Sequence, residues 1–156
     1  NQIGARVALE SPESPPAITR MVEAFQQRRD IVVAGLNAID GVTCQNPKGA
    51  FYVFPNVGGV LGQLGVLDAY AGLDEDVRQR TSPATLFQLF LLYRYRTATM
   101  DRRSFGVRGS DGEHFLRISI ATGEDDLREA VRRIETASTD AEGFADYLAS
   151  GGRLTL

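Results

Sequence analysis

The sequence predicts an α/β fold in which a small sheet packs against helices, and three observations support this class. A long amphipathic helix is expected from residue 14 onward, because apolar residues recur at helical spacing up to residue 39. Short apolar runs at 42–44, 50–54 and 115–121 are typical of strands. A second amphipathic helix follows the last of these runs.

Length and composition limit the classes of function. The 156 residues are enough for one domain with its own core, and the fractions of charged (24%) and hydrophobic (43%) residues are ordinary for a globular protein. A net charge of −3 argues against a general binder of nucleic acid or of anionic membranes. No apolar run approaches the length of a membrane span. We therefore expect neither nucleic acid nor a membrane as a partner.

Cysteine and histidine are too few for several kinds of site. The single cysteine, Cys44, cannot form an internal disulfide and fits a reducing compartment, so we expect a cytoplasmic protein. With one histidine, His114, a His/Cys zinc site cannot be assembled, and we expect no metal. We interpret His114 as a residue at the entry of a strand. The sequence begins with Asn1 rather than Met, so we expect the chain to start within a larger protein.

The first forty residues predict two helices separated by a break. Residues 3–9 are interpreted as the end of a helix. The proline-rich stretch 11–16 interrupts it, and Ser14 with the prolines that follow makes a good start for the long helix. That helix should end at Asp40-Gly41, because glycine favours a helix C-terminus.

Two short strands, at 42–44 and 50–54, are predicted on either side of a turn at 46–49. The turn contains Lys48, the only lysine beside sixteen arginines, and we expect this lysine to be solvated. Residues 55–65 are rich in glycine but lack the lysine of a phosphate-binding loop. We therefore predict a mobile loop there.

The middle of the chain predicts a buried helix followed by a basic stretch. Residues 67–80 are mixed and partly helical, and Ser82-Pro83 then begins an apolar helix over 86–93. Apolar residues on nearly all sides of this helix indicate deep burial, or contact with another domain or subunit. Residues 94–108 contain five arginines and one acid, Asp101. We interpret this stretch as a solvated face, with nucleic-acid binding as a weaker alternative.

The strand at 115–121 contains a charge among apolar residues. A buried guanidinium is costly unless an anion pairs with it, and the planar fork of arginine suits a carboxylate. Arg117 is therefore a candidate carboxylate-binding residue. The alternative is an exposed arginine on the solvated face of an antiparallel sheet. One face would carry Leu116, Ile118 and Ile120, and the other Phe115, Arg117, Ser119 and Ala121.

The C-terminal part predicts one capped helix and one short helix. Thr122 and the acids at 124–126 stand at a helix start, where the macrodipole favours negative charge. Its buried stripe should consist of Leu127, Ala130, Val131 and Ile134. Residues 141–149 form a last short helix, and 151–156 a frayed tail.

In this order the elements resemble the C-terminal small domain of fold-type I pyridoxal-phosphate (PLP) aminotransferases, the class I/II group that includes aspartate aminotransferase. The resemblance runs from Ile18 to Ala137, and the ordered set of motifs is specific although each motif alone is weak. The matching residues are Arg28-Arg29-Asp30, Leu36, Ile39-Asp40-Gly41-Val42, the run from Pro47 to Pro55, Ser104-Phe105-Gly106, Gly109, the run from Leu116 to Ala121, Leu127, Glu129-Ala130 and Arg133-Ile134.

The resemblance implies a role for Arg117 and a place for four other residues. Arg117 matches the arginine that binds the α-carboxylate of the amino-acid or 2-oxo-acid substrate. Residues at the active-site mouth would be Gly49, Phe51, Tyr52 and Phe105. The family's Pro-Gly pair before the Phe-Gly turn is replaced here by residues 100–104, so the substrate class does not carry over.

The resemblance also implies a two-layer α+β arrangement with a small mixed or antiparallel sheet, and a division of the chain. Residues 13–150 would be the small domain, 1–12 the end of a preceding inter-domain helix, and 151–156 a tail. The family's Schiff-base lysine and PLP-binding residues belong to a large domain that this chain does not contain. We therefore expect no catalytic residue in this chain, no PLP binding by it alone, and a homodimeric parent enzyme.

Two functions follow as hypotheses. In the first, the chain is the part of a PLP-dependent aminotransferase that closes over the substrate, and it is inactive alone. In the second, it is a non-catalytic module that binds a carboxylate, or a protein partner through the helix at 86–93. Under the first hypothesis this helix and the residues near Ile3 would have faced the large domain, leaving exposed apolar patches.

Overall fold

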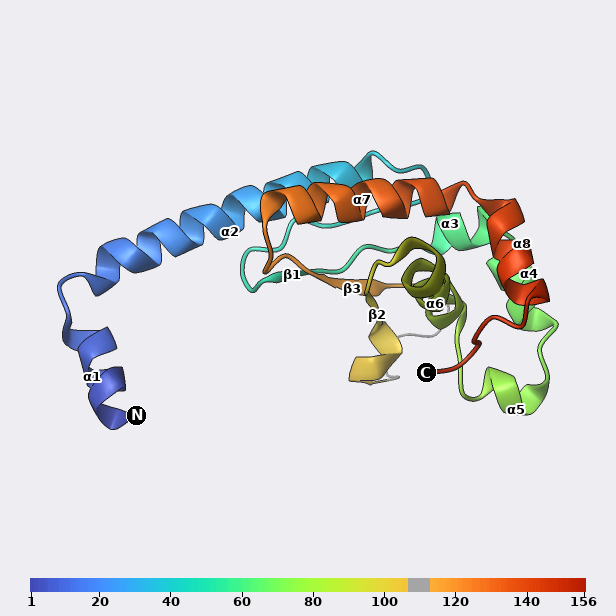
Figure 1. Cartoon of the computed structure of the whole chain (residues 1–156), viewed down its shortest axis with the longest axis horizontal. Helices are drawn as coiled ribbons and strands as arrows, with labels where there is room; N and C mark the ends of the chain where they lie inside the picture. Colours follow the sequence, from blue (N-terminus) through green and yellow to red (C-terminus); the bar gives the residue numbers. More distant parts are fainter. Residues whose placement is uncertain (107–112) are drawn as a thin grey trace.

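The computed structural model describes residues 1–106 and 113–156, and a three-stranded antiparallel sheet lies at its centre (Figure 1). The strands β1 (Tyr52–Val53), β2 (Met100–Asp101) and β3 (Leu116–Ser119) stand in the order β1-β3-β2. Tyr52 lies opposite Ser119, and Met100 lies opposite Arg117. The predicted fold class, a small antiparallel sheet packed against helices, is confirmed.

Three helices form the layer that covers the sheet. The helices α2 (Ser14–Asn37) and α7 (Glu124–Ser138) lie side by side above the sheet, and α6 (Pro83–Tyr95) packs against α7 and β2 (Figure 1). The other helical segments are short: α1 (Gln2–Glu10), α3 (Gly58–Gln63), α4 (Val66–Ala71), α5 (Glu75–Arg78), the 3₁₀ turn η1 (Arg102–Phe105) and α8 (Ala141–Ala149).

The alternation predicted for β3 is present. Leu116 and Ile118 are buried on the helix-covered face, whereas Arg117 is half-buried and Ser119 exposed on the opposite face, which we call the open face. Backbone hydrogen bonds extend the pairing beyond the short strands, because the Ile120 N–H donates to the Phe51 carbonyl at 2.9 Å. Every other residue of this central strand therefore points away from the core.

The predicted strand at 42–44 is reduced to a single bridge between Thr43 and Asn56. The side chain of Asn37 explains this, because it hydrogen-bonds to the backbone N–H and carbonyl of Cys44 that a strand partner would use. Its Oδ1 accepts from the Cys44 N–H at 2.8 Å and its Nδ2 donates to the Cys44 carbonyl at 2.9 Å. A side chain at the end of α2 thus stands where a neighbouring strand would pair.

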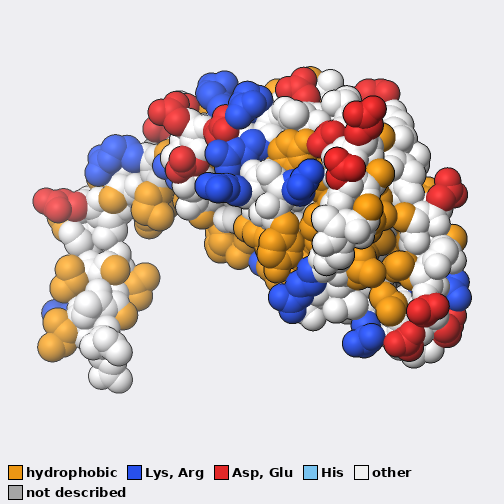
Figure 2. All heavy atoms as spheres, turned by 45° about the vertical axis from the view of Figure 1, so that its right-hand side comes forward, with side chains coloured by type: hydrophobic (Ala, Val, Ile, Leu, Met, Phe, Trp, Pro, Cys, Tyr) orange, Lys and Arg blue, Asp and Glu red, His pale blue; other side chains and the backbone are white. Residues whose placement is uncertain are grey.

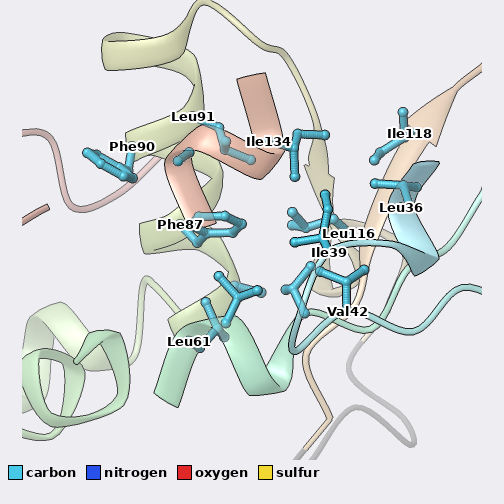
Figure 3. Close-up of a cluster of buried hydrophobic side chains, with 14 of the residues drawn as sticks. Leu36, Ile39, Val42, Leu61, Phe87, Phe90, Leu91, Leu116, Ile118 and Ile134 are labelled. Atoms are coloured by element: carbon cyan, nitrogen blue, oxygen red, sulfur yellow. The ribbon is translucent and has the colours of Figure 1, made fainter. Parts of the chain in front are cut away.

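The hydrophobic core lies between the sheet and the helices, and Figure 3 shows Phe87 of α6 pointing into it. The α6 residues 86–91 are all buried, whereas Leu92 (39%), Tyr93 (52%) and Arg94 near its end are exposed. The prediction of deep burial is confirmed. The expectation that this helix faces another domain or a partner is wrong for residues 86–91, because these residues pack within this chain. Neighbouring core residues include Leu36, Ile39, Val42, Leu61, Leu116, Ile118 and Ile134.

The prediction of a mobile loop at 55–65 is wrong, because the helix α3 begins at Gly58. Apolar residues at 57, 60, 61 and 64 are buried at helical spacing, and this packing outweighs the low helix propensity of glycine. Gly41, with φ +80°, lies directly against this helix. A Cβ placed on Gly59 would stand 2.5 Å from the Gly41 Cα, so the two backbones touch.

The solvated face predicted for 94–108 is also wrong in part. Thr97, Thr99 and Asp101 are buried, and β2 and η1, which the sequence did not predict, lie in this stretch. Arg94 and Arg96 are exposed as expected. Residues 107–112, and with them Arg108 and Gly109, lie outside the described residues.

The N-terminal helix α1 and the first turns of α2 form an arm that stands away from the body (Figures 1 and 2). All residues of α1 are exposed, including Ile3 (82%) and Leu9 (86%). The apolar stripe predicted for α2 is buried only in its C-terminal half, since Ile18 is 56% exposed whereas Val32 is 1%. The exposed apolar patch expected near Ile3 is therefore present.

The C-terminal helices follow the prediction, except that the N-cap of α7 is Gly123 without a side-chain cap, rather than Thr122, and that the tail differs. The helix α8 spans the predicted residues 141–149. Residues 152–156 form no helix or strand, but the Tyr147 hydroxyl donates to the Arg153 carbonyl at 2.7 Å, and Leu154 packs against the core. The tail is thus anchored rather than frayed at its start. Within the described ranges, no helix is long and apolar enough to cross a membrane.

Candidate functional site

Arg117 lies on the middle strand of the sheet, between two aromatic rings. Its guanidinium carbon is 4.2 Å from the ring centroid of Tyr52 and 4.3 Å from that of Phe105. Both rings offer their π-systems to the cation, which stabilises the stacked arrangement. Its Nη2 also lies 2.9 Å from Sδ of Met100, the residue opposite it on β2. Strand pairing and stacking therefore hold the guanidinium on the open face.

No carboxylate of residues 1–106 or 113–156 lies within 4.0 Å of the Arg117 guanidinium. Seven ion pairs occur among these residues, and all involve other arginines, such as Arg132 and Arg133 with Glu129. Those two guanidinium groups hold the pKa of Glu129 at about 2 by hydrogen bonding. A half-buried arginine held by aromatic rings, rather than by a carboxylate, can use its N–H groups for an external anion.

The open face around Arg117 is largely aromatic. Residues directly opposite each other in an antiparallel pair share a face, so Tyr52 and Met100 accompany Arg117. Phe54 (41% exposed) and Phe105 (50% exposed) pack edge to face with centroids 6.4 Å apart. A hollow of about 460 Å³ beside Tyr52 is lined in part by Phe54 and Phe115. A ligand at Arg117 would therefore meet aromatic rings as well as charge.

The four residues expected at the active-site mouth lie at two separate places. Tyr52 and Phe105 flank Arg117, whereas Gly49 and Phe51 line a separate hollow of about 290 Å³ against α2. Phe51 connects the two places, because its ring centroid is 4.3 Å from that of Tyr52. Ala50, between them, has φ +63°, which is an unusual backbone conformation for a residue with a Cβ.

Lys48 is exposed, as the sequence predicts, at the edge of the hollow lined by Gly49. A lysine that forms a Schiff base is usually desolvated in an apolar pocket or placed next to another cationic group. No aspartate or glutamate lines this hollow, so it provides no partner for a pyridinium nitrogen. The described residues therefore do not fit the role of holding PLP through Lys48.

His114 is half-buried just before β3, which agrees with the predicted strand entry. Its carbonyl accepts from the Val57 N–H at 2.8 Å, and burial lowers the pKa of its imidazole. No group of three or more metal-ligating side chains occurs within the part of the chain that the structure describes.

Two residues at the site, Met100 and Asp101, were not predicted from the sequence. Met100 contacts Arg117, and Asp101 is buried beneath η1, although both belong to the stretch interpreted as a solvated face. The missed signal was alternation, because Thr97, Thr99 and Asp101 are the buried residues of an extended segment. The arginines on both sides of this segment, at 94, 96, 102 and 103, drew attention away from this pattern.

A family profile and the sequences of related proteins indicate the same family for this chain. A family profile described as "Aminotransferase class I and II" matches residues 2–134. The chain is 37% identical to an aspartate aminotransferase of Rhizobium meliloti (strain 1021), covering 88% of this chain and 29% of that protein. It is 39% identical to an aspartate/prephenate aminotransferase of Cereibacter sphaeroides, covering 86% of this chain and 29% of that protein.

Solved structures similar to this chain are also aminotransferases. The aspartate aminotransferase from Rhizobium meliloti aligns with a TM-score of 0.61 at 36% identity, over 85% of this chain and 29% of that one. An aromatic aminotransferase from Pyrococcus horikoshii OT3 aligns with a TM-score of 0.65 at 29% identity, over 87% of this chain and 30% of that one. The chain thus spans less than a third of the length of these relatives.

Proposed function

Because the chain belongs to the aminotransferase class I and II family, we propose that it is the C-terminal small domain of a PLP-dependent aminotransferase. Residues 13–150 form this domain, 1–12 belong to the segment that precedes it, and 151–156 are its tail. Its task is to close over an amino-acid or 2-oxo-acid substrate and to bind the α-carboxylate through Arg117.

The surroundings of Arg117 support this role more than any other observation. The guanidinium is half-buried, held between Tyr52 and Phe105, and within 4.0 Å of no carboxylate of the described residues. Holding the side chain in one orientation reduces the entropy lost when a ligand binds. A planar fork fixed in this way suits the two oxygens of a carboxylate.

The chemical steps belong to the part of the enzyme that this chain does not include. PLP supplies the electron sink of aminotransfer, and it requires a lysine that the described residues do not offer in a suitable place. The chain alone is therefore inactive, and its partners are the large domain and, in the parent enzyme, a second subunit. The buried free thiol of Cys44 favours a reducing compartment such as the cytoplasm.

A second candidate is a non-catalytic module that binds a carboxylate or a protein partner. The exposed arm favours it, because Ile3, Val7 and Leu9 offer an apolar surface. Contact through α6 gives it little support, since residues 86–91 of that helix are buried in this chain. The coding sequence upstream of Asn1 distinguishes the two candidates: the serine-rich lysine motif of the family indicates the enzyme, and an immediate start codon indicates the module.

The carboxylate site can be tested with ¹³C-methyl-methionine NMR, because the chain has only two methionines. Met100 contacts Arg117, and Met21, exposed on α2, serves as the internal control. Titration with pyruvate should shift the Met100 signal to saturation and leave the Met21 signal unchanged. Arg117→Gln should weaken binding roughly tenfold or more, because a hydrogen bond to a charged group contributes about 1.5–3 kcal/mol.

Two controls make this result specific to the carboxylate and to Arg117. Methyl pyruvate lacks the carboxylate and should not shift Met100. Arg128→Gln removes an exposed arginine of α7 and should bind pyruvate as the unchanged chain does. Equal binding of the ester, or unchanged affinity in Arg117→Gln, would refute the proposed role.

A further inference from the structure

A buried carboxylate lies beneath the arginine site. Asp101 is 3% exposed, and within residues 1–106 and 113–156 no cationic side chain lies within 4.0 Å of its carboxylate. Burying an anion without a cation is costly unless several hydrogen bonds replace its hydration. The sequence around Asp101 departs from the family pattern, so the family resemblance assigns no role to this residue.

Asp101 forms hydrogen bonds with four residues. Its Oδ2 accepts from the hydroxyls of Ser82 and, at 2.7 Å, Thr85. Its Oδ1 accepts from the Arg103 N–H at 3.0 Å. Its own N–H donates to Oε1 of Gln88 at 2.6 Å. Three of these partners lie at the N-terminal end of α6, and the fourth belongs to η1.

The same contacts cap both segments. Ser82 is the N-cap of α6, where its Oγ accepts from the Thr85 N–H at 3.0 Å, and Asp101 is the N-cap of η1. The Arg103 guanidinium donates to the Thr81 carbonyl and so adds a second connection. Buried polar contacts thus fasten the 3₁₀ turn to the start of α6.

Because Phe105 belongs to η1, the contacts that hold η1 also affect the position of the Phe105 ring on the open face. The Phe105 ring covers one side of the Arg117 guanidinium at 4.3 Å, while Tyr52, on the neighbouring strand, covers the other at 4.2 Å. Tyr52 is fixed by the pairing of β1 with β3. Phe105 is 50% exposed and packs edge to face with Phe54, so the position of its ring depends on the backbone of η1 and on this one aromatic contact.

We propose that Asp101 is a positioning residue for the carboxylate site: it holds η1 so that Phe105 stacks on Arg117 and orients the guanidinium toward a ligand. Replacing the carboxylate by an amide leaves the hydroxyl of Ser82 or Thr85 without an ionised acceptor. The 3₁₀ turn then loosens, and the guanidinium loses one of its two aromatic neighbours. This inference rests on the proposed function of Arg117.

The test is a double-mutant cycle on the 156-residue chain, with pyruvate as the probe and the Met100 methyl signal as the readout. Asp101→Asn and Phe105→Leu should each weaken pyruvate binding, by roughly three- to tenfold. The double variant should be no weaker than the weaker single variant, because both changes remove the same stacking contact. Asp146→Asn changes an exposed aspartate on α8 that makes no side-chain hydrogen bond or ion pair among the described residues, and it should leave binding unchanged.

A spectroscopic signature separates positioning from a general loss of stability. The Nε–H proton of Arg117 should be shifted upfield by the two rings, and Asp101→Asn and Phe105→Leu should move it by a similar amount in the same direction. Thr85→Val removes one hydroxyl donor with little change of shape and should move this signal partway. It replaces Asp101→Asn if that variant does not fold.

Three outcomes would overturn the inference: unchanged pyruvate affinity in Asp101→Asn, additive effects in the double variant, or an Arg117 signal that moves only in Phe105→Leu. If the unchanged chain does not bind pyruvate at all, the proposed function fails. The Arg117 signal then still decides whether Asp101 positions Phe105, so the two failures can be told apart.

Discussion

On the face of the sheet turned toward the helices, β3 carries Leu116 and Ile118, both buried; on the open face it carries Arg117 and Ser119. The first face is packed by side chains from α2, α6 and α7, whereas aromatic rings, Met100 and the 3₁₀ turn border the second. One strand thus separates the residues that stabilise the fold from the residue that we propose to bind substrate. We therefore expect that substitutions at adjacent positions of β3 can change stability and ligand recognition independently.

The largest effect is expected on the helix-covered face. Leu116→Ala removes a side chain that is 1% exposed, and the cavity should lower the free energy of unfolding by about 2–5 kcal/mol. Ser119→Ala, on the open face of the same strand, should change it by about 0.5 kcal/mol or less. Urea unfolding of both variants measures the difference. Similar losses for the two would show that the faces do not divide the tasks as described.

A smaller effect is expected for Arg117 itself. Arg117→Met keeps the apolar length of the side chain and removes two cation–π contacts, which contribute about 0.5–1 kcal/mol each at exposed sites. The free energy of unfolding should therefore fall by about 1–2 kcal/mol in urea titrations, whereas pyruvate binding should be lost. Arg128→Met is the matched control on α7. A loss as large as that of Leu116→Ala would mean that Arg117 is mainly a structural residue.

The smallest effect concerns a polar contact on the helix side. Burial, and a hydrogen bond of 2.5 Å from the Tyr95 hydroxyl to Oδ2 of Asp140, raise the pKa of Tyr95 to about 12. Between pH 10 and 12 the unfolded chain loses this proton while the folded chain keeps it, so stability falls as the pH rises. Below pH 10 the contribution is fully present.

Urea midpoints at pH 9 and pH 11.5, compared between the unchanged chain and Tyr95→Phe, isolate this residue from the other tyrosines. The unchanged chain should lose more stability over this interval than the variant does. Equal losses would indicate that Asp140 does not hold the protonated hydroxyl, and that the helix side depends on apolar packing alone.

Much of the fold was predictable because long amphipathic patterns, and the Ser82 cap of α6, are local signals. The helices α2, α6 and α7, and the alternation of β3, all follow from residue spacing. The helix α3 was missed because glycine at 58, 59 and 62 lowers local helix propensity, whereas its burial depends on contacts with distant residues such as Gly41. Local composition cannot report such contacts.

The candidate site was predictable only in part. Arg117 stood out because a charge occurred within an apolar strand, although its role as a carboxylate ligand stays a prediction. The Asp101 contacts could not be foreseen, because they join residues 82–88 to 101–103 across the fold. The apolar surface of α6 suggested an absent partner, since a sequence pattern does not distinguish a core within the chain from an interface.

The contact between Gly41 and Gly59 limits how this sequence can change over evolutionary time. A Cβ on Gly41 would lie 2.7 Å from the Val60 nitrogen, and one on Gly59 would lie 2.5 Å from the Gly41 Cα. A crowded pair of larger residues can be relieved when its partner becomes smaller, but here both members are already the smallest residue. Neither position therefore has a compensating substitution in the other, and a complete mutational scan should find glycine alone accepted at both.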